Sequence, residues 1–362
     1  MKYIDEYRDR TLATKLIDSI KSVTDGIYSP VTLMEICGTH TVAISKYGIR
    51  QLLPKNIRII SGPGCPVCVT PLGEIDAALE LSSIDNVILT TFGDMLHVPG
   101  TSGSLEELRA TGRDIRIVYS SLDSLKIAAD NPHKQVIFLG VGFETTAPGS
   151  ARTIHRAHQM KLENFSLLCL HKLVPPALKA LLSLDENRIN GFICPGHVSV
   201  IIGAHVYELL TRAGKAAVVT GFEPLDILEG LWLLLKQIEA GTPKVDIQYS
   251  RVVTWSGNTY AQKEMERVFE PCDVSWRGLG KIPESGLKIR DPFAFYDAAR
   301  RFKVKAVHKN DPPGCCCGEI LRGMKTPHDC PLFGKKCTPA EPVGPCMVSN
   351  EGACAAYYRY AS

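Results

Sequence analysis

Between residue 31 and about residue 250 the chain repeats one pattern: a short apolar run, a turn of glycine, proline or small polar residues, and a segment with helical periodicity. Short strands that alternate with helices are typical of βαβ units, which build parallel sheets. The pattern therefore predicts an α/β fold. The apolar runs lie at residues 31–36, 57–60, 86–90, 115–119, 135–139, 165–170, 191–193 and 216–219.

Eight runs are enough for one closed (β/α)₈ barrel or for two four-stranded sheets. We favour two sheets because the runs are unevenly spaced and because the unusual polar motifs follow only the first, second, fifth and seventh of them. The sequence DNPH at 130–133 resembles a linker, which predicts α/β domains at 31–128 and 129–254. Residues 1–30, with a helix at 5–23, and residues 255–362 would form a third lobe. Further helices are expected at 72–81, 225–238 and 291–302, and the stretches 274–280 and 283–286 resemble loops.

Composition limits the kinds of partner. The chain has 362 residues, 45% apolar and 22% charged, with a formal charge of +3, as in an ordinary globular protein of two or three domains. Such a balanced charge does not favour nucleic acid or a membrane surface. The first residues, MKYIDEYRDR, do not form a secretory signal, and no apolar stretch reaches the ~20 residues of a membrane span. We expect a cytoplasmic protein.

The unusual residues follow strands. In open parallel sheets ligands bind beyond the carboxyl ends of the strands, so loops from two facing sheets would line one cleft. The residues that these loops carry are Cys37 and His40 after the first run, Cys65 and Cys68 after the second, Glu144 after the fifth and His197 after the seventh.

Each loop allows a chemical and a plainer interpretation. A CxxC pair between a strand and a helix indicates a redox pair or half of a metal site, although two reduced cysteines in a turn would fit as well. Cys37 and His40 place a thiol three residues before an imidazole. Such a pair can supply a soft metal ligand beside a proton acceptor. It can also be a buried cysteine beside a histidine at the start of a helix. The Gly140–Gly142 turn before Glu144 lacks the third glycine and the lysine of a phosphate loop. His197 could equally be a neighbour of a helix cap.

The C-terminal stretch is rich in cysteine. Seven of the thirteen cysteines lie between residues 315 and 354, among prolines that prevent regular structure. We therefore expect a metal site or a covalent cross-link to hold this segment in shape. Cys315, Cys330, Cys337 and Cys354 are separated by 14, 6 and 16 residues, which suits structural zinc or an iron–sulfur cluster. Because paired CxxC knuckles are absent, we favour the cluster. Cys317 could replace Cys315 as its first ligand, and Cys346 could then form a disulfide with the cysteine left over.

Five motifs together resemble one known family. They are CGTH at 37–40, GPGCPVC at 62–68, GFETT at 142–146, PGHVS at 195–199 and CMVSNEGAC at 346–354. Each alone is a weak signal, but in this order along the whole chain they resemble the HypD hydrogenase maturation proteins.

The resemblance implies a scaffold on which the Fe(CN)₂CO group of nickel–iron hydrogenases is assembled. The partners would be a HypC-type small chaperone and HypE as cyanide donor, with HypF upstream. It also implies two similar α/β domains and a lobe with a 4Fe–4S cluster. Cys37 would hold the transient iron, shared with a HypC cysteine, beside His40, while Cys65 and Cys68 would form the redox pair.

Glu144 and His197 match family positions that line the same cleft, and electrons would pass from the cluster through thiol pairs. The extra thiol Cys316 departs from the family pattern and leaves the first cluster ligand open. The competing interpretations are an iron–sulfur-dependent thiol–disulfide oxidoreductase acting on a protein disulfide and a zinc-stapled binding protein.

Overall fold

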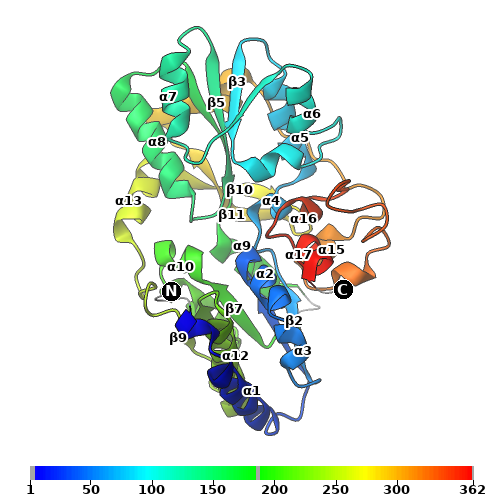
Figure 1. The fold of residues 1–362 in the computed structure, drawn as a ribbon. Helices are drawn as coiled ribbons and strands as arrows, with labels where there is room; N and C mark the ends of the chain where they lie inside the picture. The colour runs from blue at the N-terminus through cyan, green and yellow to red at the C-terminus, as the bar shows by residue number, and fades with distance from the viewer. Residues whose placement is uncertain (1–4, 185–187, 361–362) are drawn as a thin grey trace.

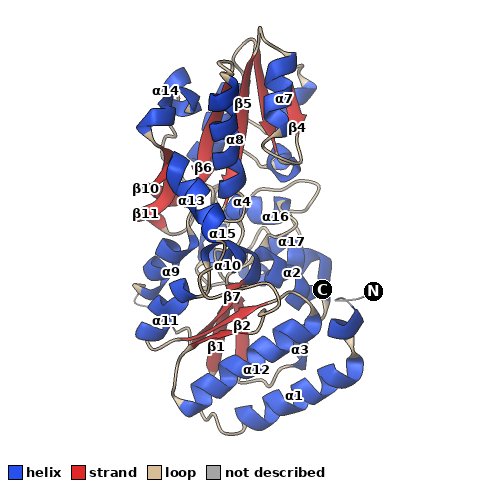
Figure 2. Cartoon of the chain, turned by 90° about the vertical axis from the view of Figure 1, so that its left-hand side faces the viewer, coloured by secondary structure: helices blue, strands red, loops and turns tan. Residues whose placement is uncertain are grey.

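The computed structural model describes residues 5–184 and 188–360, which form two parallel sheets, a β-hairpin and an irregular C-terminal lobe (Figures 1 and 2). The strands are β1 (Val31–Glu35), β2 (Ile57–Ser61), β3 (Val87–Thr91), β4 (Asp114–Ile117), β5 (Gln135–Gly142), β6 (Phe165–His171), β7 (Gly191–Pro195), β8 (Ala216–Thr220), β9 (Val245–Ile247), β10 (Phe269–Trp276) and β11 (Gly280–Ile289). The α-helices are α1 (Arg10–Thr24), α2 (Gly38–Lys46), α3 (Ile49–Leu52), α4 (Pro66–Val69), α5 (Leu72–Ser82), α6 (Leu105–Ala110), α7 (Asp123–Asp130), α8 (Ala147–Met160), α9 (Val174–Leu182), α10 (Gly196–Ile202), α11 (Glu208–Arg212), α12 (Pro224–Ala240), α13 (Thr259–Val268), α14 (Ala298–Phe302), α15 (Cys317–Leu321), α16 (Pro345–Val348) and α17 (Ala353–Tyr360). Short 3₁₀ helices are η1 (Asp5–Arg8), η2 (Gly93–His97), η3 (His205–Tyr207), η4 (Asp291–Tyr296) and η5 (Pro327–Asp329).

The predicted α/β class is confirmed, and each of the eight apolar runs is a strand, β1 to β8. Sheet A has the order β2-β1-β7-β8-β9 and sheet B the order β4-β3-β5-β6. All strand pairs in both sheets are parallel. Every residue of β3, β7 and β8 is buried, as expected for strands covered on both faces. The two separate sheets exclude the barrel.

The sheets are interleaved along the chain, which differs from the predicted consecutive sheets. Sheet A takes strands from residues 31–61 and 191–247, and sheet B takes those from 87–171. The expected boundary at 128/129 falls inside α7. After β2 the chain leaves sheet A through α5, which packs on β3, and it returns at β7 to pair with β1. A crossover within a sheet and one between sheets have similar local sequences, so the pattern could not separate them.

Residues 269–289 form an antiparallel hairpin, β10 and β11, where loops were expected. Glycine and proline in this stretch indicated turns, but the strands tolerate them because the register shifts between Cys272 and Val274. An isolated bridge joins Gly286 of β11 to Lys172, directly after β6, and β11 contacts β6, so the hairpin lies beside sheet B rather than within the lobe. The short strand β9 was also missed.

The N-terminal helix α1 belongs with sheet A, not with the cysteine lobe as predicted. Asp9 caps it by accepting the N–H of Leu12 at 2.9 Å, and its apolar face packs on α12. The predicted helices at 72–81 and 225–238 are α5 and α12, whereas 291–302 divides into η4 and α14. No helix among residues 5–184 and 188–360 is long and apolar enough to cross a membrane.

The C-terminal lobe packs at the junction of the two sheets (Figure 1). Its helix α17 lies against α2 of the sheet A region, and α16 lies against α4. The lobe therefore reaches the loops that follow β1 and β2.

Candidate functional site in the cleft

A cavity of about 420 Å³ lies where the carboxyl ends of the two sheets face one another. Residues of all four predicted loops line it, together with one residue from the C-terminal lobe. The lining residues are Ile36, Cys37, Thr39, Gly64, Pro66, Phe143, Thr145, Thr146, Pro195, His197, Val198, Val200, Ile201 and Glu351. Of the predicted site residues, Cys37 and His197 face the cavity, while His40, Cys65, Cys68 and Glu144 are buried in its surroundings.

Cys37 stands at the transition from β1 to α2. It is the N-cap of α2 with extended backbone, and its own N–H donates to Oε2 of Glu35 at 3.1 Å. The hydroxyl of Thr41 donates to Oε1 of the same carboxylate. Glu35 thus fastens the turn that presents the thiol, and Cys37 is only 8% exposed.

The surroundings of Cys37 keep its thiol protonated. Burial raises the pKa of Cys37 to about 12, and the negative charges of Glu351 and Glu35 add to this. The backbone amides of Thr39 and His40 at the start of α2 act in the opposite direction. Burial likewise raises the pKa of Glu35 to about 7. A cation bound in the cavity would offset the free-energy cost of ionising these buried groups, because it stabilises the thiolate and the carboxylates together.

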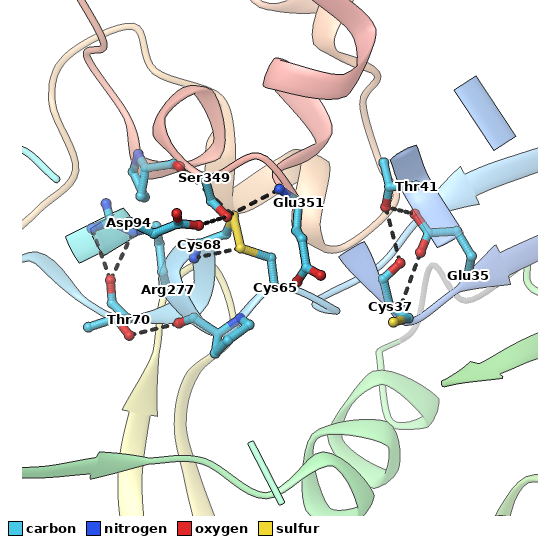
Figure 3. The surroundings of a disulfide bond; sticks show 12 residues. Glu35, Cys37, Thr41, Cys65, Cys68, Thr70, Asp94, Arg277, Ser349 and Glu351 are labelled. Atoms are coloured by element: carbon cyan, nitrogen blue, oxygen red, sulfur yellow. Dashed lines mark hydrogen bonds between the residues drawn. A yellow bond between two sulfur atoms is a disulfide. The ribbon is translucent and has the colours of Figure 1, made fainter. Parts of the chain in front are cut away.

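The GPGCPVC loop lies directly on this turn. Gly38 donates its N–H to the carbonyl of Gly64 at 3.0 Å, and a Cβ on Gly64 would come within 2.2 Å of the backbone nitrogen of Cys37. Cys65 and Cys68 are joined by a disulfide, in which Sγ of Cys65 also accepts the N–H of Cys68 at 3.2 Å (Figure 3). The predicted pair is therefore formed, one loop away from Cys37.

Two histidines meet on one aromatic ring. Phe222, after β8, lies between His40 and His197, with ring centroids at 4.7 Å and 4.0 Å. His40 is fully buried, and its Nε2 lies 2.9 Å from the carbonyl of Gly221, which can only accept a hydrogen bond. Nε2 therefore carries the proton, leaving Nδ1 with a free lone pair and no partner. Burial lowers the pKa of His40 to about 4, so the ring is neutral at physiological pH.

Glu144 is a buried carboxyl group from sheet B. One oxygen, Oε1, accepts the N–H of Val174 at 2.9 Å, and Oε2 has no partner. Burial raises the pKa of Glu144 to about 7. The group can therefore hold or release a proton near neutral pH.

Glu351 was missed by sequence reasoning, although it lies within the CMVSNEGAC motif. It comes from the C-terminal lobe, and its Oε1 accepts the hydroxyl of Thr39 at 2.7 Å. Its backbone N–H donates to Ser349, whose hydroxyl donates to Asp94 at 3.1 Å (Figure 3). Because Thr39 and Glu351 are far apart in sequence, no local pattern could have joined them. Glu351 is the one carboxylate among the described residues that line the cavity.

The cysteines of the lobe divide into two neighbouring groups. Cys317 is central in the first group, where its thiol interacts with those of Cys315, Cys346 and Cys354, and Cys337 lies close enough to Cys354 for a charge on it to raise the pKa of Cys354. All of them are free thiols in the structure. A Cβ on Gly344 would lie 2.7 Å and 2.8 Å from the sulfurs of Cys317 and Cys315, so only glycine permits this approach.

The second group contains Cys316 and Cys330. The two thiols interact with each other, and each lies 3.8 Å from the carbonyl of Gly314. The extra thiol thus contacts Cys330, which was expected as a cluster ligand. Of the predicted set, Cys315, Cys337 and Cys354 belong to the first group and Cys330 to the second. Among the described residues of this lobe, no three His, Cys, Asp or Glu side chains stand at the spacing of metal ligands. The C-terminal lobe nevertheless offers mostly buried thiols in an irregular segment, and such thiols are the ligands that iron–sulfur clusters use.

The chain is similar to proteins of one family along nearly its whole length. The HypD family model, described as the hydrogenase formation hypA family, matches residues 11–361. Hydrogenase maturation factor HypD2 of Bradyrhizobium diazoefficiens is 47% identical over 99% of this chain and 97% of its own length. The HypD factors of Azotobacter vinelandii and Escherichia coli are 47% and 44% identical over 99% of this chain and 97% and 98% of their own lengths. The chain therefore belongs to the HypD family of hydrogenase maturation factors.

Proposed function

We propose that this maturation factor is the scaffold on which the Fe(CN)₂CO group of nickel–iron hydrogenases is assembled, with Cys37 holding the iron as cargo. The observation that carries the proposal is the position of Cys37: a single thiol at the start of α2 that faces a cavity bounded by both sheets and the lobe. Low-spin ferrous iron with strong-field ligands suits a soft thiolate. A HypC-type chaperone would share the iron, and HypE, supplied by HypF, would deliver cyanide.

Iron binding at Cys37 would release the thiol proton. The thiol is neutral in the free protein, so a ferrous ion takes the place of the proton and its charge is balanced by Glu351 and Glu35. The cavity walls are largely apolar, which excludes water from the bound group and strengthens the attraction between iron and these carboxylates. His197 and Thr145 supply polar groups on the opposite walls.

Two buried groups would handle protons near the cleft. Oε2 of Glu144 can hold a proton near neutral pH, while Nδ1 of the neutral His40 ring has a free lone pair that can accept a hydrogen bond from a group carrying one. A hydrogen bond at the other polar atom of each side chain, Nε2 of His40 and Oε1 of Glu144, fixes its orientation.

Cys65 and Cys68 would act as the thiol pair nearest to the iron. The lobe would hold a 4Fe–4S cluster through Cys315, Cys330, Cys337 and Cys354, with Cys317 or Cys346 as substitutes. When bound, such a cluster supplies one-electron chemistry.

A thiol–disulfide oxidoreductase acting on a partner's disulfide is the weaker candidate. Cys65 and Cys68 are 3% and 0% exposed, so a folded protein substrate could not reach their sulfurs. Such an enzyme would also not need the thiol of Cys37.

The proposal is tested by hydrogenase maturation in a host that lacks its own HypD factor. Cys37→Ser should abolish hydrogenase activity, whereas Cys194→Ser, a change of another buried cysteine at the end of β7, should leave most of it. Normal maturation by Cys37→Ser would contradict the proposal.

A further inference from the structure

Arg277 is a buried cation that touches both the CxxC loop and the entry to the cysteine lobe. It directly follows β10, and only 4% of it is exposed. Its sequence context, WRGLG at 276–280, resembled a plain loop, and the proposed function assigns it no task.

Most of the hydrogen bonds of Arg277 hold the end of helix α4, which carries the disulfide. Its backbone N–H donates to the carbonyl of Val69 at 2.8 Å. Its Nε and Nη2 both donate to the carbonyl of Thr70, at 3.2 Å and 3.0 Å. Because α4 spans only Pro66–Val69, Arg277 supplies donors for carbonyl groups at its end, where no further helical turn follows.

The remaining contacts of Arg277 lead to the lobe. Nη1 forms an ion pair with Asp311, four residues before Cys315. The next residue, Gly278, has φ +79° and abuts Gly318 of α15, where a Cβ would come within 2.5 Å of backbone atoms. On the other side of the loop, the sulfur of Cys68 lies 3.9 Å from the carbonyl of Pro345 in α16. The CxxC loop is thus held against the lobe through Arg277 on one side and through the contact between Cys68 and Pro345 on the other.

We infer that Arg277 is a positioning residue for the Cys65–Cys68 pair, which fixes the loop in the geometry that favours the disulfide and keeps it docked on the lobe. Since Asp311 neutralises the guanidinium, its geometry matters more than its net charge. The inference rests on the proposed role of this pair as a working thiol couple.

The test is the disulfide–dithiol equilibrium of the full chain in dithiothreitol buffers, followed by alkylation and mass spectrometry of the peptide that contains Cys65 and Cys68. Dithiothreitol gives two electrons and two protons to the two sulfurs, the Cys65–Cys68 bond breaks, and the reductant becomes a cyclic disulfide. Arg277→Met should lower the equilibrium constant for the protein disulfide about tenfold, which is about 30 mV toward easier reduction. Arg277→Lys should give a similar shift, because an ammonium group cannot form the same set of hydrogen bonds to the Thr70 carbonyl and to Asp311 at once.

The matched control is Arg290→Met, which removes a guanidinium that also donates to a backbone carbonyl, that of Phe269 at 2.9 Å, but whose contacts with Phe269 and Glu270 lie at the opposite end of β10 from Arg277. It should leave the equilibrium unchanged. If Arg277→Met does not fold, Arg277→Lys carries the test. An unchanged equilibrium in the folded Arg277 variant, or a shift toward harder reduction that lysine restores, would overturn the inference. Neither result touches the proposed role of Cys37, which the maturation assay tests separately.

Discussion

The cleft and the C-terminal lobe both carry buried cysteines, but they position them by different means. Cys37 and Cys65 stand at strand-to-helix transitions, where glycine contacts and backbone hydrogen bonds fix them. The lobe cysteines lie in short helices and turns, where their main neighbours are one another. The cleft should therefore keep its shape without any one thiol, whereas the lobe should depend on its cysteines.

The largest expected effect is in the lobe. Cys354→Ser removes a ligand of the proposed cluster and should lower the free energy of unfolding of the cluster-containing protein by at least about 3 kcal/mol, because the bound metal stabilises the fold. Urea denaturation and limited proteolysis measure this. Cys37→Ser should change the stability by less than about 1 kcal/mol, and equal losses in the two variants would contradict the comparison.

In the cleft, stability should depend on glycine rather than on sulfur. Gly64→Ala forces a methyl group into the backbone of Ile36 and Cys37 and should cost about 3 kcal/mol, as overpacking does. Gly149→Ala in α8 is the control, since its nearest neighbour would be 3.7 Å away, and it should be neutral or slightly stabilising. Thermal denaturation of both variants compares them, and a harmless Gly64→Ala would refute this picture of the loop contact.

Glu144 should make the cleft sensitive to pH. Its folded pKa of about 7 lies above its unfolded value of ~4.3, so its protonated form adds stability at low pH that is lost as pH rises through 7. Relative to Glu144→Gln, the wild-type chain should lose up to about 3 kcal/mol between pH 5 and pH 8. Denaturant titrations at several pH values measure the difference, and a pH-independent gap would show that the carboxyl group is ionised throughout.

The smallest effect on folding is expected at Glu351, where the lobe meets the cleft. Glu351→Gln keeps a hydrogen-bond acceptor for Thr39 but removes the charge that faces Cys37, so ferrous iron should bind about tenfold more weakly while stability changes by less than about 0.5 kcal/mol. Anaerobic iron titration measures the affinity, with exposed Glu266→Gln on α13 as the control. Unchanged iron affinity would show that Glu351, and through it the lobe, does not contribute to the iron site.

The sequence predicted those parts of the fold that depend on local pattern. Each apolar run became a strand, and the loops after β1, β2, β5 and β7 meet at one cavity because parallel strands share a carboxyl edge. The pairing of β1 with β7 was not predictable, since nothing in either strand specifies its neighbour. Glu351, Phe222 and Arg277 were missed for the same reason: their contacts depend on tertiary packing alone.

Whether Cys37 holds iron beside a cluster in the lobe is decided by the metal and acid-labile sulfide content of anaerobically purified protein. We expect about four irons and about four sulfides per chain in both wild type and Cys37→Ala, with additional iron only in the wild type. Stoichiometric zinc without sulfide, or additional iron that Cys37→Ala retains, would contradict it.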